Sequence, residues 1–70
     1  MNLDTARSKV KSYLGVPLKF IYRGARNQIE EFNGIITNCY KSIFIIETNT
    51  HVIKSFSYND FIIKNIKIIT

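Results

Sequence analysis

The sequence has little of the residue types on which disulfide-bonded, metal-binding and histidine-dependent proteins rely. Among its 70 residues there is one cysteine, Cys39, and one histidine, His51. A single cysteine excludes a disulfide within the chain and a zinc site built from several thiolates. His51 follows a polar turn without the partners that a triad or metal cluster needs, so we expect a surface turn residue. We expect no cofactor and no metal.

Two further patterns that carry chemistry are missing. The three glycines, Gly15, Gly24 and Gly34, lie too far apart to form a loop that cradles phosphate. Glu30 and Glu31 are adjacent, and adjacent residues of a strand point to opposite faces, which makes them a poor acid–base pair. We therefore expect that the protein is not an enzyme.

Long apolar runs are missing as well. Residues 1–7 lack the apolar centre of a secretory signal, and no run approaches the ~18 apolar residues needed to span a bilayer. We therefore expect a cytoplasmic protein that does not enter a membrane. A chain of 70 residues can build one small core, so we expect a single domain over residues 1–70.

Acidic residues are scarce and unevenly placed. Ten lysines and arginines oppose five acidic residues, which gives a net charge of +5. Residues 1–28 hold six of the cations and only one acid, Asp4, whereas the charges of residues 29–70 cancel. One face or end of the domain is therefore predicted to be basic.

A helix is predicted over residues 3–14. Leu3, Ala6 and Val10 recur at helical spacing, and Gly15 followed by Pro17 favours termination of the helix near Leu14. β-Branched residues are abundant after this point, which predicts strands over about residues 17–69.

Alternating and isoleucine-rich runs predict five strands. In the first, Leu18, Phe20 and Tyr22 alternate with more polar positions. The predicted strands are Leu18–Tyr22, Gln28–Tyr40 with a bend or bulge at Gly34, Ile43–Glu47, His51–Phe56 and Phe61–Ile69. A tight or 3₁₀ turn is expected at Ser57–Asp60, and the last strand should pair with the first to close a barrel. The predicted fold class is mainly β, a small five-stranded SH3-like or Sm-like barrel with a short N-terminal α-helix.

Four cations form the predicted binding site. Lys19 and Arg23 alternate to the same side of the first strand, Arg26 extends from the following loop, and Lys41 lies in a later connection. Arginine presents a planar fork to phosphate or carboxylate, and exposed aromatic residues could stack bases. The alternative is that the aromatic residues fill the core and the cations only keep the domain soluble.

Three segments of the sequence follow one another in an order that is typical of one family. They are Gly34-Ile35-Ile36, Tyr40-Lys41-Ser42-Ile43-Phe44-Ile45-Ile46 and Ser55-Phe56-Ser57-Tyr58-Asn59-Asp60. They resemble the Veg family of low-GC Gram-positive bacteria, in which a Gly-apolar-apolar strand leads to a Tyr-Pro-Ser-apolar-Phe run and then to a Ser-Tyr-x-Asp corner. Gly24–Glu30 is similar to the family's glycine- and arginine-rich loop, so the resemblance covers roughly residues 7–69.

The chain also departs from the family pattern. Lys41 replaces the usual proline, Asn27 and Gln28 stand where the family is more basic, and the link between helix and first strand is shorter. The resemblance implies a small SH3-like barrel with an N-terminal helix that is not an enzyme. It also implies stimulation of biofilm formation by antagonising a repressor of matrix genes.

Three functional hypotheses follow. The first is a Veg-like regulatory protein that binds a macromolecule, foremost a protein regulator, through Lys19, Arg23, Arg26 and Lys41. The alternative is an Sm-like or SH3-like nucleic-acid-binding module in which the same cations contact phosphate. The third is a homodimer formed through the isoleucine-rich last strand or the helix, which would bury apolar surface that a small monomer leaves exposed.

Overall fold

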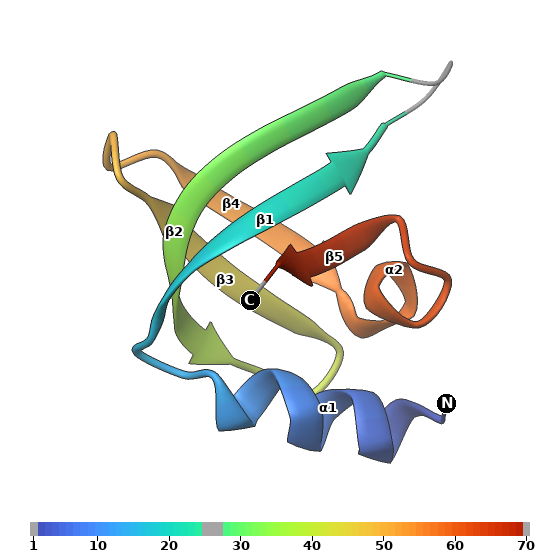
Figure 1. The fold of residues 1–70 in the computed structure, drawn as a ribbon. Coiled ribbons are helices and arrows are strands. Elements are labelled where there is room, and N and C mark those ends of the chain that lie inside the picture. The colour runs from blue at the N-terminus through green and yellow to red at the C-terminus, as the bar shows by residue number, and fades with distance from the viewer. Residues whose placement is uncertain (1, 25–27, 70) are drawn as a thin grey trace.

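The computed structural model describes residues 2–24 and 28–69. The elements follow in the order α1 (Leu3–Ser12), β1 (Pro17–Arg23), β2 (Ile29–Cys39), β3 (Ile43–Thr48), β4 (Ile53–Ser57), α2 (Tyr58–Ile62) and β5 (Ile66–Ile69). The strands form one antiparallel sheet in the order β4-β3-β2-β1-β5, which curls on itself above α1 (Figure 1). The predicted mainly β fold, with five strands and a short N-terminal helix, is confirmed.

Helix α1 begins and ends where its flanking residues satisfy the free backbone groups. The Asn2 side chain accepts a 2.8 Å hydrogen bond from the Thr5 N–H, as an N-cap does. Ala6 and Val10 are fully buried and form the apolar stripe that faces the sheet. The helix ends at Ser12, two residues before the predicted end, and Gly15 adopts the left-handed conformation with φ 79°.

Strand β2 serves two halves of the curled sheet. Its first half pairs with β1, and its second half pairs with β3 from Gly34 onward. A Cβ atom at Gly34 would lie 2.7 Å from the Glu47 carbonyl oxygen, so only glycine allows the strands to approach this closely. The predicted bulge at Gly34 is wrong in position, because the register irregularity lies between Ile36 and Asn38, and Gly34 instead permits close contact between β2 and β3.

The predicted last strand is wrong over its first half. Phe61 and Ile62 belong to α2, and β5 comprises only Ile66–Ile69. Ser57 accepts a bond from the Asp60 N–H while the Asp60 carboxylate accepts one from the Ser57 N–H, and this capping box starts a helical turn. β5 pairs with β1, as predicted, and α2 connects β4 to β5 across the remaining gap in the curled sheet (Figure 1).

The core fills the space between the curled sheet, α1 and α2. Its buried residues are Ala6, Val10, Phe20, Ile36, Phe44, Ile46, Phe56, Tyr58 and Ile66. The rings of Phe44 and Tyr58 lie 5.5 Å apart, and those of Phe20 and Phe32 lie 5.4 Å apart. In the described part of the chain, no helix is long and apolar enough to cross a membrane.

Candidate functional site

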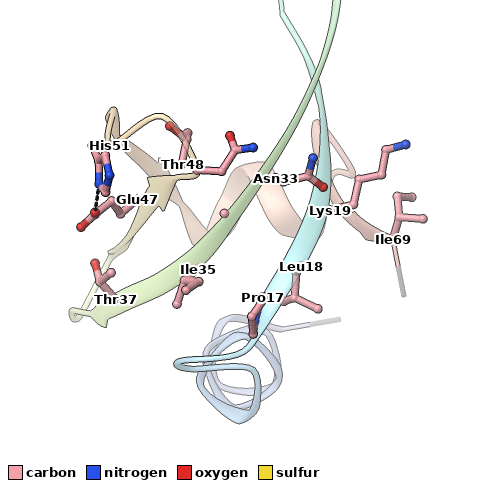
Figure 2. Close-up of a pocket in the computed structure, with 12 residues that line it drawn as sticks. Pro17, Leu18, Lys19, Asn33, Ile35, Thr37, Glu47, Thr48, His51 and Ile69 are labelled. Carbon is pink, nitrogen blue, oxygen red and sulfur yellow. Dashed lines mark hydrogen bonds and ion pairs between the residues drawn. The ribbon is translucent and has the colours of Figure 1, made fainter.

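A hollow of about 640 Å³ lies over the middle strands of the sheet (Figure 2). β1 contributes Pro17 and Lys19, β2 contributes Asn33 and Ile35, and β3 contributes Glu47. These side chains point away from the core because their neighbours in each strand point into it. We call this region the outer-face hollow.

Strand register brings the lining residues together in rows. Pro17 pairs with Ile35, which pairs in turn with Glu47. In the next row, Lys19 lies between Asn33 and Ile69. The side chains of Ile35 and Ile69 remain 37% and 42% exposed, so the hollow presents apolar surface to solvent.

The charged groups at the outer-face hollow are paired. Lys19 Nζ lies 3.0 Å from Glu31 Oε1, and His51 Nδ1 lies 3.0 Å from Glu47 Oε2, the second pair being visible in Figure 2. Both pairs are exposed, so each contributes little to stability, about 0–1 kcal/mol. The Glu31 carboxylate offsets the charge of Lys19, and the His51 imidazole hydrogen-bonds with the Glu47 carboxylate. His51 is an exposed turn residue, as predicted.

Two of the four predicted cations share this face. Lys19 lines the outer-face hollow, and Arg23 lies on the same side of β1 at the end of the strand, where it pairs with Ile29. Arg23 is exposed, and its backbone N–H donates a 2.7 Å bond to the Asn65 carbonyl. Arg26 lies outside the described residues.

Lys41 does not join the other predicted cations. It follows Cys39 at the end of β2, whereas Arg23 pairs with the first residue of that strand. The contact made at Lys41 uses its backbone: the carbonyl accepts bonds of 2.8 and 3.2 Å from Nη2 and Nε of Arg7. Lys41 therefore belongs to the α1 end of the domain, and a single patch of Lys19, Arg23 and Lys41 does not form.

The surface has a second depression, which was not predicted from the sequence. It has a volume of about 540 Å³ and lies between α1 on one side and α2 with β5 on the other. Its lining is Lys9, Tyr13, Phe61, Ile62, Lys64, Ile66, Lys67, Ile68 and Ile69. Lys9 comes from α1, whereas Lys64 and Lys67 come from the segment that includes β5, and no spacing within the sequence signals that these two segments meet. We call this region the lysine groove.

The described residues hold no group of three or more histidine, cysteine or acidic side chains that could bind a metal ion. Cys39 is half-buried next to Tyr58. Burial raises the pKa of the Tyr58 hydroxyl, and the neighbouring Cys39 raises it further, while Arg7 lowers it.

Comparison with known protein families gives a match over nearly the whole chain. Residues 1–69 match the family model described as biofilm formation stimulator VEG, as the resemblance in the sequence predicted. No curated protein matches the chain. The motifs that carry the resemblance have structural roles here, because Gly34 permits close strand contact and Ser57 and Asp60 form the capping box.

Proposed function

The chain belongs to the VEG family of biofilm formation stimulators, and we propose that it performs this role in the cytoplasm without catalysis, by binding a regulatory protein. Binding would antagonise a repressor of matrix genes, as the family resemblance implies. The surface we assign to this partner is the outer-face hollow, with Lys19 in its lining and Arg23 further along β1.

The observation that carries the proposal is the combination of exposed apolar side chains with paired charges. Ile35 and Ile69 offer apolar area, and Pro17 adds a rigid apolar edge. Protein interfaces have an apolar centre that is poor in charge and a polar rim, and contiguous exposed apolar surface marks such sites. Arg23 supplies a rim residue of the type that is enriched in interfaces.

The same surface is poorly suited to phosphate. Lys19 is engaged by Glu31, and the carboxylate of Glu47 also lies in the lining. The phosphates of a nucleic acid would have to break the ion pair between Lys19 and Glu31 and would lie close to the negative charge of Glu47. A protein partner is therefore the better match for the outer-face hollow.

Site-specific crosslinking tests the proposal. A photoreactive amino acid at Asn33, inside the hollow, should crosslink to one protein in the source cells, and the same group at exposed Ser8 on α1 should not. Ile35→Asp should abolish this crosslink and lower biofilm formation. Ile43→Asp is the matched control, because Ile43 is 39% exposed on the same sheet but does not line the hollow.

The proposal is contradicted if Ile35→Asp, with a melting temperature equal to that of Ile43→Asp, still supports crosslinking and full biofilm formation. Equal crosslinking from Asn33 and from Ser8 would also contradict the proposal, because contact would then not be specific to the outer-face hollow.

A further inference from the structure

The lysine groove has an apolar floor. Tyr13 approaches from just beyond α1, Phe61 and Ile62 come from α2, and Ile66 and Ile68 come from β5. Ile66 is buried, and the other four are half-buried against the core, so each leaves part of its side chain open to the groove. An apolar surface of this kind favours aliphatic side chains of a partner.

The rim of the lysine groove carries charge of one sign. Lys9, Lys64 and Lys67 are exposed and line it, and no acidic residue does so. Among the described residues, none of these three lysines takes part in an ion pair, in contrast to Lys19 and Lys54. Within residues 2–24 and 28–69, the groove therefore presents three ammonium groups without an acidic partner around apolar surface.

Lys64 adopts a backbone conformation that favours glycine. Its φ is 66°, and it occupies the position after the C-cap of α2. The Lys64 N–H donates to the Phe61 carbonyl and the Asn65 N–H donates to the Asp60 carbonyl, at 3.2 and 2.8 Å, which is the Schellman pattern of helix termination. A side chain at this position strains the backbone, and such strain points to a function for the side chain.

We propose that the lysine groove is a second binding surface beside the outer-face hollow and that it binds an acidic amphipathic helix of a protein partner. The helix would place apolar side chains on the isoleucines and phenylalanine of the floor and carboxylates beside Lys9, Lys64 and Lys67. An amphipathic helix seated in an apolar groove is a recurrent mode of peptide recognition. A single-stranded nucleic acid fits less well, because a floor made largely of isoleucine offers few aromatic faces on which bases could stack.

Fluorescence polarisation with a labelled helical peptide, leucines on one face and glutamates on the other, tests this assignment at physiological salt. The intact chain should bind the peptide, and a peptide with the leucines replaced by serine should not bind. Lys64→Gly should weaken binding about two- to fivefold while leaving the melting temperature unchanged or higher, because glycine relieves the strained conformation. A loss of binding with no loss of stability separates a role in recognition from a role in folding.

A charge-matched pair of double variants sharpens the test. Lys64→Gly with Lys67→Gln removes two charges from the lysine groove, and Lys11→Gln with Lys41→Gln removes two charges from elsewhere. Only the first pair should weaken peptide binding strongly. Equal weakening by both pairs would overturn the proposal, since net charge alone would then explain the affinity.

Two more measurements identify what the groove takes. If a single-stranded oligonucleotide binds more tightly than the peptide, and Lys64→Gly with Lys67→Gln abolishes oligonucleotide binding, the proposed occupant is wrong. Ile35→Asp should leave peptide binding intact, and the groove variants should leave the crosslink from Asn33 intact. These two results show separately whether the proposal for the lysine groove or the proposal for the outer-face hollow is wrong.

Discussion

The hydroxyl of Tyr58 donates a 2.8 Å hydrogen bond to the backbone carbonyl of Tyr40. The next two carbonyls along the chain also accept bonds from other elements. The Lys41 carbonyl accepts a hydrogen bond from the Arg7 guanidinium of α1, and the Ser42 carbonyl accepts one from the Tyr58 N–H at 3.2 Å. Three successive carbonyls therefore join the β2–β3 turn to α1 and α2, although the side chains of this turn are exposed.

Tyr58→Phe should destabilise the fold by about 1–3 kcal/mol, because the Tyr40 carbonyl would lose its partner while the ring still packs. Chemical denaturation measures the difference. Tyr40→Phe is the control: the Tyr40 side chain is 54% exposed and its carbonyl is unaffected by the change, so stability should stay within about 0.5 kcal/mol. Equal stabilities of the two variants would contradict the assigned role of the hydroxyl.

Stability should fall as the pH rises above about 10. Burial, and then Cys39, raises the pKa of Tyr58 above its usual value of 10.0. The unfolded state therefore releases the Tyr58 proton at lower pH than the folded state. The stabilisation of the folded state by protonated Tyr58 is complete below pH 10 and is lost as the pH rises above it. Denaturation midpoints measured across this range should fall less steeply for Tyr58→Phe than for the intact chain. Parallel curves would show that other groups cause the decline.

Gly34→Ala should destabilise the fold by about 1–3 kcal/mol, since the new methyl group would meet backbone atoms of β3 that cannot move without breaking the sheet. Gly24→Ala is the matched control, because its nearest contact, Tyr22 Cε2, would lie at an ordinary 3.6 Å. Thermal melts of both variants test the difference. A neutral Gly34→Ala would mean that β2 and β3 are less tightly apposed than described.

Nucleic-acid binding at the predicted cations should be negligible at physiological salt, because Glu31 neutralises Lys19 and Lys41 lies apart. A salt-series titration of the intact chain against single- and double-stranded nucleic acid, with Lys19→Ala/Arg23→Ala alongside, measures this. Micromolar binding that is lost in the double variant, with a log–log slope of about −0.7 to −0.9 per phosphate contacted, would favour the nucleic-acid alternative.

The strand pattern was predictable wherever one face is buried and the other is exposed. Leu18, Phe20 and Tyr22 alternate clearly with their neighbours, and the strand forms as expected. The run from Phe61 to Ile69 is apolar at most positions, so its periodicity does not distinguish helix from strand. Ser57 and Asp60 had the spacing of a capping box and were the available signal for α2.

The two proposed binding surfaces were less predictable because they depend on register and on contacts between distant segments. The pairing of Lys19 with Glu31 follows from the alignment of β1 with β2, which the sequence does not specify. Lys9 and Lys64 meet at one groove only because α1 packs against α2. The contact of Arg7 with Lys41 uses a backbone oxygen, which every residue type possesses.

Strand β5 borders both cavities, since Ile69 lines the outer-face hollow and the lysine groove alike. The strand is four residues long, and among the described strands it pairs with β1 alone. Two ligands that rest on this one short strand are thermodynamically linked whenever either displaces it. If occupancy of the groove changes the affinity of the hollow by some factor, occupancy of the hollow changes the affinity of the groove by the same factor.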